Sequence, residues 1–175
     1  MNKPWLYPII RPLLVIWFCI TYLPKYKNKS VIPKKGRVIL AGNHTNAKDA
    51  ILLGTSTTRW VRYLSKDSLT KGLFGFFIKA MGVVAVNRKI QDKTVIPAAI
   101  KLLEAENVVA VFPEGTINRT DDIIMPFKAG AIKMAIQSNT PIIPFVIKGE
   151  YKVFRKRVRI IFGDLYYPKT KDITK

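Results

Sequence analysis

Acidic residues are scarce in this sequence. Its 175 residues include only 11 Asp or Glu against 30 Lys or Arg, which gives a net charge of +19 and a pI near 10.2. No acidic residue precedes Asp49, and the charged residues of the segment 148–175 are again mostly basic. A surplus of one sign on this scale predicts an anionic partner, which is a nucleic acid, an anionic lipid or a phosphate-bearing substrate.

Cysteine and histidine are almost absent as well. The single cysteine, Cys19, lies in an apolar run, so no internal disulfide is possible and the residue is interpreted as a small hydrophobic side chain. One cysteine and one histidine supply too few of the usual ligands for a metal site, and neither a metal nor a resident cofactor is expected. No helix-turn-helix, zinc-finger or RNP-type aromatic motif is present, which argues against a nucleic-acid partner.

A long uninterrupted apolar run is also lacking. Residues 5–23 are apolar and aromatic, but two prolines and an arginine interrupt them, which leaves the clean run Leu13–Leu23. Eleven helical residues span roughly 17 Å, whereas a bilayer core is about 30 Å thick. Residues 1–30 are therefore predicted to be a monotopic membrane anchor of one or two short interfacial helices. The lysines of residues 25–35 would face anionic lipid, at roughly 1 kcal/mol each.

Two other interpretations of this N-terminal segment stay open. Its hydrophobicity on all sides is compatible with a helix buried in the protein core. A signal peptide is the second, although no small-x-small cleavage site follows the apolar run.

Residues 31–175 alternate between short apolar runs and helical patterns. The expected strands are 36–42, 60–64, 83–86, 108–112, 141–147 and 158–162, and the expected helices include 95–103 and 129–137. Strands and helices in alternation predict a single α/β domain with a largely parallel central sheet flanked by helices. In such a sheet, the functional site is expected in the loops that leave the carboxyl ends of the strands.

The only histidine lies at such a strand end. His44 follows the predicted strand 36–42 directly, in the run Asn-His-Thr-Asn-Ala-Lys-Asp that ends at Asp49. With Thr45 or Asn46 as helix cap, the Asp49 carboxylate falls in a first helical turn and can fold back to the imidazole. There it would fix the tautomer of His44 and stabilise an imidazolium. The spacing alone fits a surface histidine before a helix equally well.

Three later motifs follow this pair in order. They are a glycine, a short strand and an arginine at 82–88, Phe-Pro-Glu-Gly-Thr at 112–116, and Pro-Ile-Ile-Pro at 141–144. Together with His44 and Asp49 they resemble the glycerolipid acyltransferase family, whose motifs are N-H-x4-D, G-x5-R, F-P-E-G-T and a proline-flanked hydrophobic strand. The pattern is most similar to that of bacterial 1-acyl-sn-glycerol-3-phosphate acyltransferases and extends from about Gly36 to Gly149.

The resemblance implies roles for individual residues. His44 is expected to be the general base, and Asp49 is expected to orient it. Arg88 would hold the substrate phosphate, because a guanidinium pairs with phosphate oxygens in a bidentate way. The residues expected to shape the acceptor site are Glu114, Gly115 and Thr116.

Two further cations are candidates for the phosphate. Lys128 is added because of its charge and position. The family motif usually continues with an arginine and a serine, where this sequence has Ile117 and Asn118. Arg119 follows and is the candidate substitute for that arginine, so the identity of the acceptor stays open at this point.

The reaction implied by the resemblance belongs to phospholipid biosynthesis. A fatty acyl group would pass from acyl-CoA or acyl carrier protein to the free hydroxyl of 1-acyl-sn-glycerol 3-phosphate (lysophosphatidic acid), which gives phosphatidic acid at the cytoplasmic face of the cell membrane. No G-x-S-x-G nucleophile motif is present, so direct transfer without an acyl-enzyme is expected. The alternatives are an acyltransferase for glycerol 3-phosphate or another lysophospholipid, and a non-catalytic basic protein that binds membranes.

Overall fold

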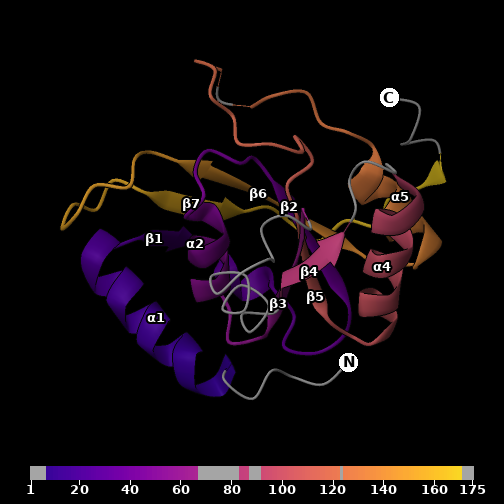
Figure 1. Cartoon of the computed structure of the whole chain (residues 1–175), viewed down its shortest axis with the longest axis horizontal. Helices are drawn as coiled ribbons and strands as arrows, with labels where there is room; N and C mark the ends of the chain where they lie inside the picture. Colours follow the sequence, from indigo (N-terminus) through magenta and orange to yellow (C-terminus); the bar gives the residue numbers. More distant parts are fainter. Residues whose placement is uncertain (1–6, 67–82, 87–91, 123, 171–175) are drawn as a thin grey trace.

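A twisted, mostly parallel sheet forms the centre of the computed structural model, which describes residues 7–66, 83–86, 92–122 and 124–170 (Figure 1). Within these residues the strand order is β1-β7-β6-β2-β5-β3-β4, and every neighbouring pair is parallel except β6 and β7. The strands are β1 Lys25–Lys27, β2 Val38–Gly42, β3 Val61–Lys66, β4 Val83–Val86, β5 Val108–Val111, β6 Ile142–Lys148 and β7 Arg159–Phe162. The predicted α/β class and largely parallel sheet are confirmed.

Helices cover both faces of the sheet. The structure describes the helices α1 Tyr7–Tyr22, α2 Asp49–Thr55, α4 Asp92–Glu104 and α5 Gly130–Gln137, together with a short 3-10 helix at Lys29–Val31. Side chains on one face of β2, such as Leu40, lie in a core cluster with Phe18 of α1 and Leu52 of α2. Alternate residues such as Ile39 lie in a second cluster with α4 and α5. The result is a three-layer arrangement with α1 and α2 on one side of the sheet and α4 and α5 on the other.

Burial on both faces explains why β2 was readable from the sequence. Val38, Ile39 and Leu40 are fully buried, and a parallel strand covered on both faces is a continuous apolar run. The strand ends at Gly42, where a Cβ would lie 2.2 Å from the Phe145 carbonyl oxygen of β6. Glycine is therefore needed for β2 and β6 to pair up to the point where the chain leaves the sheet.

Helix α1 is longer than the clean apolar run predicted. It is continuous from Tyr7 to Tyr22 and has Pro12 inside it. Pro12 lies only five residues from the first described helical residue, so its missing N–H removes a single bond near the start of the helix. Arg11 does not break the helix either, because its guanidinium donates to the carbonyl oxygens of Gly54 and Thr57 at the end of α2. A cation is favoured at a helix C-terminus.

The outer face of α1 is apolar and uncovered. Phe18 and Tyr22 are buried against the core, whereas the five residues that we call the α1 stripe are 51–65% exposed: Ile9, Leu13, Ile16, Trp17 and Ile20. Their spacing of three and four places them on one side of the helix. The interpretation of this segment as a core helix therefore holds for one face only. Across the described part of the chain, no helix combines the length and the apolar character that a membrane crossing requires.

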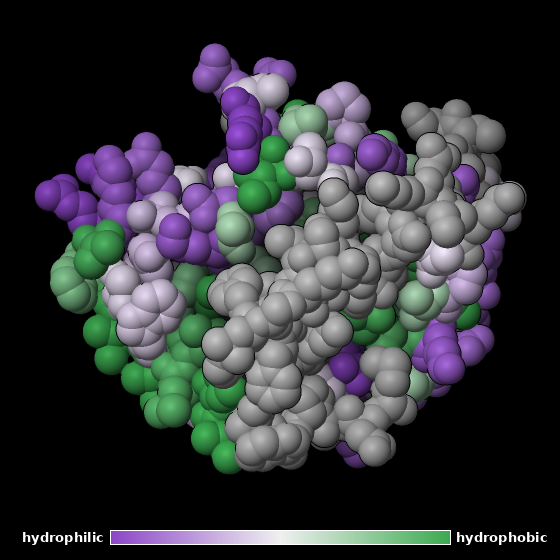
Figure 2. All heavy atoms as spheres, in the orientation of Figure 1, coloured by the Kyte–Doolittle hydropathy of each residue, from purple (hydrophilic) through white to green (hydrophobic). Residues whose placement is uncertain are grey.

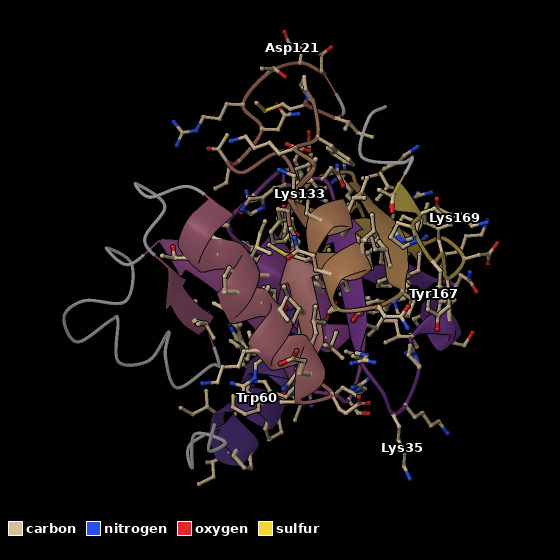
Figure 3. The ribbon with its side chains drawn as sticks, turned by 90° about the vertical axis from the view of Figure 1, so that its right-hand side faces the viewer. Lys35, Trp60, Asp121, Lys133, Tyr167 and Lys169 are labelled. Atoms are coloured by element: carbon tan, nitrogen blue, oxygen red, sulfur yellow. The ribbon has the colours of Figure 1, made fainter. Side chains whose placement is uncertain are left out.

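The connection from β5 to α5 leaves the sheet at the carboxyl end of β5. Figure 3 shows it projecting beyond the body of the protein, with Asp121 near its tip and Lys133 on α5 below. Its first residues belong to the Phe-Pro-Glu-Gly-Thr motif, so the fold places that motif at the carboxyl edge of the sheet, beside the loop that follows β2.

Candidate active site

Two motifs that are far apart in the sequence meet at the carboxyl edge of the sheet. Strands β2 and β5 are parallel neighbours, and Ala41 pairs with Val111 at their ends. His44 follows β2, and Glu114 follows β5. The backbone N–H of His44 donates to Oε1 of Glu114 at 3.3 Å, across 70 residues of sequence.

His44 and Asp49 form a hydrogen-bonded pair. The His44 Nδ1 atom lies 3.0 Å from Oδ2 of Asp49, with the Asp49 side chain fully buried and the His44 side chain 17% exposed. The same carboxylate oxygen accepts the backbone N–H groups of Thr45 at 2.6 Å and Asn46 at 2.8 Å. A buried carboxylate with several donors is held in one orientation, and the pairing favours the tautomer with the proton on Nδ1.

The predicted helix cap is wrong in detail. The N-cap residue of α2 is Lys48, and the structure gives it no side-chain cap hydrogen bond. Thr45 and Asn46 lie before the helix, where their N–H groups donate to Asp49, and the Asn46 side chain accepts the N–H of Lys48 at 3.1 Å. The turn is organised by the carboxylate of the first helical residue, because that group accepts both backbone donors and the imidazole at once.

Two further contacts position His44, one through its ring and one through its backbone. The Phe112 ring stacks on the imidazole with centroids 4.0 Å apart and an interplanar angle of 16°. The His44 carbonyl accepts the backbone N–H of Asn118 at 2.6 Å. With Nδ1 turned to Asp49, the Nε2 atom is left to accept a proton, and this arrangement suits general acid–base chemistry.

The Phe-Pro-Glu-Gly-Thr motif forms a tight turn beside this pair. Glu114 is buried, and within the described residues its Oε2 atom has no hydrogen-bond partner. Gly115 has φ +76°, and a Cβ there would lie 3.0 Å from Nζ of Lys128. The backbone N–H of Lys128 donates to the Pro113 carbonyl at 3.0 Å. Glycine at 115 therefore permits both the turn and the close approach of the lysine.

The other predicted site residues have no described contact with the His44–Asp49 pair. Thr116 and Arg119 are exposed on the β5–α5 connection, which the Asn118 contact holds beside His44. The prediction for Arg88 lies outside the described residues. The structure thus brings together His44, Asp49, Glu114, Gly115 and Lys128, with Thr116 and Arg119 on the adjoining segment.

Tyr151 was missed by the sequence analysis. It lies in the connection between β6 and β7, and its hydroxyl donates to Oδ1 of Asp49 at 2.5 Å across 102 residues. Its ring packs edge-on against Phe18 and Tyr22 of α1. Burial, reinforced by the neighbouring Asp49 carboxylate, raises the pKa of the Tyr151 phenol well above its ordinary value, so the group remains a donor. A lone tyrosine in a basic connection gives no sequence signal for this contact.

Comparisons with known proteins agree on one family. A family model described as Acyltransferase matches residues 24–148. A protein of Borreliella burgdorferi is 35% identical over 130 residues, which cover 73% of this chain and 52% of that protein. A Bacillus subtilis protein is 28% identical over 146 residues, which cover 80% of this chain and 72% of that protein. Both relatives are named 1-acyl-sn-glycerol-3-phosphate acyltransferase.

A solved structure shares the fold. The crystal structure of the 1-acyl-sn-glycerophosphate (LPA) acyltransferase PlsC from Thermotoga maritima superposes with a TM-score of 0.71 at 19% identity. The match covers 96% of this chain and 72% of the other. The chain spans about half the length of the Borreliella relative, at 52%.

Proposed function

Since this chain belongs to the Acyltransferase family, we propose that it transfers a fatty acyl group from acyl-CoA or acyl carrier protein to 1-acyl-sn-glycerol 3-phosphate. The observation that carries the proposal is the His44–Asp49 pair at the end of β2, with Glu114 on the backbone of His44. Two relatives named for this reaction support the choice of acceptor.

In the proposed mechanism His44 acts as a general base. Its Nε2 atom takes the proton of the acceptor hydroxyl while the hydroxyl oxygen attacks the thioester carbonyl. Asp49 stabilises the imidazolium that results, since its carboxylate lies at Nδ1. When the tetrahedral intermediate collapses, the C–S bond breaks and the imidazolium returns its proton to the leaving thiol. The products are phosphatidic acid and the free thiol of the carrier.

The acceptor phosphate requires cations near the His44–Asp49 pair, which we call the dyad. We assign this role to Lys128, whose Nζ lies over Gly115, with Arg119 on the adjoining exposed segment and Arg88 from the second motif. Ile117 and Asn118 stand where the family pattern has an arginine and a serine, and this departure favours testing glycerol 3-phosphate and other lysophospholipids as acceptors too.

The α1 stripe supports a membrane location for the reaction. Five large apolar side chains on one helical face are exposed, and the opposite face packs on the protein core. An amphipathic helix of this kind lies in a bilayer interface with its apolar face among the acyl chains. We propose that α1 holds the protein monotopically on the cytoplasmic face of the cell membrane, where a lysolipid reaches the dyad without leaving the bilayer.

The test is thiol release by the detergent-solubilised protein. With a long-chain acyl-CoA, or acyl carrier protein as donor if coenzyme A fails, release is expected only when lysophosphatidic acid is added. Glycerol 3-phosphate and a set of lysophospholipids serve as competing acceptors. Release that is the same without any acceptor, or no release with either donor and any acceptor, would contradict the proposal.

Tyr151→Phe is expected to lower kcat about tenfold and leave KM for the acyl donor unchanged. The change removes a hydrogen bond to a buried carboxylate, a type worth roughly 1.5–3 kcal/mol, but keeps the ring against α1. Because the raised pKa keeps the phenol protonated, the loss is expected to be constant between about pH 6 and pH 9. Steady-state kinetics across this range measure both parameters.

The matched control is Tyr26→Phe. Tyr26 is another partly buried tyrosine, but its hydroxyl pairs with Thr55 Oγ1 at 2.6 Å instead of with Asp49. It is expected to lose stability without a change in kcat. Equal effects of the two variants on kcat would show that Tyr151 supports only the fold and does not position Asp49.

A further inference from the structure

A second exposed apolar feature lies at the β6–β7 connection, residues 149–158. Val153 and Phe154 are 54% and 70% exposed at its tip. Phe154 has φ +53°, a region that bulky side chains rarely adopt, and its N–H donates to the Thr21 carbonyl of α1 at 2.6 Å. The contact with α1 therefore holds a strained backbone in a conformation that presents the phenylalanine ring to the surroundings.

The apolar pair is set among cations. Residues 150–157 contain four basic side chains and a single carboxylate: Lys152, Arg155, Lys156, Arg157 and Glu150. The carboxylate is paired with Lys152 at 2.8 Å and lies 3.9 Å from Arg157. The connection therefore keeps a positive charge around Val153 and Phe154, which complements an anionic surface.

The connection continues the apolar surface of α1. It is joined to the last turn of α1 by the hydrogen bond from Phe154 to Thr21, while Tyr151 packs on the buried side of the same helix, against Phe18 and Tyr22. Figure 2 shows hydrophobic residues along the lower left edge, over α1, and further hydrophobic residues at the left, where the β6–β7 connection of Figure 1 lies among hydrophilic ones. The α1 stripe and the tip of the connection thus lie on adjoining parts of the surface.

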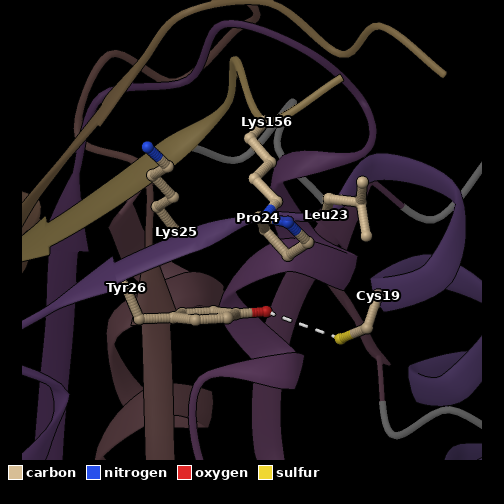
Figure 4. A pocket seen from close by; sticks show the side chains of 6 residues that line it. All are labelled: Cys19, Leu23, Pro24, Lys25, Tyr26 and Lys156. Atoms are coloured by element: carbon tan, nitrogen blue, oxygen red, sulfur yellow. Dashed lines mark hydrogen bonds between the residues drawn. The ribbon is translucent and has the colours of Figure 1, made fainter. Parts of the chain in front are cut away.

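A hollow lies between the end of α1, strand β1 and this connection (Figure 4). It has a volume of about 360 Å³ and is lined by Cys19, Leu23, Pro24, Lys25, Tyr26 and Lys156. Lys156 reaches from the connection toward Pro24 in this view, and Lys25 comes from β1. The two lysines stand beside an apolar lining, an arrangement that suits a phosphate with acyl chains attached to it.

We propose that the β6–β7 connection is a second membrane contact, through which Val153 and Phe154 insert beside α1 into an anionic bilayer. Lys25 and Lys156 then meet lipid phosphates at the depth of the headgroups. The proposal rests on the proposed function for the membrane location of α1, and adds to it a second insertion point in the connection between β6 and β7. Single exposed apolar residues are common on protein surfaces. Val153 and Phe154 differ because they are adjacent, are surrounded by cations and lie against an apolar helix.

The test compares the full-length protein with Val153→Ser/Phe154→Ser on vesicles of phosphatidylcholine mixed with phosphatidylglycerol. The partition coefficient from co-sedimentation is expected to fall roughly tenfold, because the two side chains lose most of their apolar area. The matched control is Leu165→Ser/Tyr167→Ser, an exposed pair after β7, with Tyr167 on the side shown in Figure 3. It is expected to partition like the wild type. A loop variant that partitions like the wild type overturns the proposal.

A charge variant tests the cationic part separately. Lys25→Gln/Lys156→Gln is expected to weaken binding to the mixed vesicles severalfold and to leave binding to pure phosphatidylcholine vesicles unchanged. Equal binding of this variant and the wild type to the mixed vesicles would overturn the assignment of the lysines to lipid phosphates.

Thiol release in detergent separates this proposal from the proposed function. Val153→Ser/Phe154→Ser is expected to retain wild-type thiol release on detergent-dispersed substrates. Loss of vesicle binding in the loop variant of a protein that never releases thiol supports the membrane contact and refutes the acyl transfer. Thiol release by a protein whose loop variant still binds vesicles like the wild type refutes the membrane contact alone.

Discussion

His44→Ala is expected to lower kcat for acyl transfer by about two to four orders of magnitude, the contribution of a positioned general base. The imidazole is the only side chain in the described site that combines a buried carboxylate partner at Nδ1 with a second nitrogen left to accept a proton. Without it, the acceptor hydroxyl must lose its proton to water. The measurement is lysophosphatidic acid-dependent thiol release by the purified variant.

The variant is expected to fold. The backbone contacts of His44 to Glu114 and Asn118 do not use the imidazole, and Asp49 Oδ2 retains the N–H donors of Thr45 and Asn46. Vesicle partitioning equal to that of the wild type serves as the control for a folded, membrane-competent protein. Thiol release that survives in this variant would refute the proposed mechanism, whatever the family membership.

Asp49→Asn is expected to lower kcat by a similar factor, about 10² to 10⁴, while the protein stays folded. The amide is nearly isosteric, and its oxygen can still accept the N–H groups of Thr45 and Asn46. It carries no negative charge, however, so the imidazolium of His44 loses its stabilisation at Nδ1. The kcat of acyl transfer is therefore expected to fall while the protein remains folded.

Asp49→Ala separates these two contributions. It leaves the N–H groups of Thr45 and Asn46 and the hydroxyl of Tyr151 without their acceptor in a buried site. Each lost partner costs roughly 1–3 kcal/mol, so this variant is expected to unfold at a clearly lower urea concentration than Asp49→Asn. Urea unfolding measures stability, and thiol release measures chemistry. An asparagine variant that keeps wild-type kcat would show that the charge of Asp49 has no role in the reaction.

Strands β2 and β5 were predictable because burial on both faces leaves a continuous apolar run in the sequence. All six expected strands are present, with ends that differ by no more than a few residues, and the helices at 95–103 and 129–137 lie within or beside α4 and α5. Strand β1 was not predicted, since Lys-Tyr-Lys is short, basic and paired only along the edge with β7. An edge strand is specified by its partner more than by its own residues.

In the candidate site, too, some contacts were predictable from the local sequence and others were not. The catalytic assignments to His44 and Asp49 remain predictions, but their meeting at 3.0 Å follows from five residues of local sequence. The buried Glu114, the stacked Phe112 and the lysine over Gly115 could be placed near His44 only when the sheet was known. These contacts depend on β5 lying next to β2, a pairing that hydrophobic periodicity does not encode.

By itself the sequence determined the α/β class, the acyltransferase family pattern, the charge and the pairing of His44 with Asp49, because these depend on composition and on residues close together in the chain. Only the tertiary structure decided the strand order, the exposed face of α1 and the contact of Tyr151 with Asp49. These depend on which elements bury one another's surfaces. The apolar residues of α1 look alike along the chain, and the packing of Phe18 and Tyr22 in the core decides which face of the helix stays exposed.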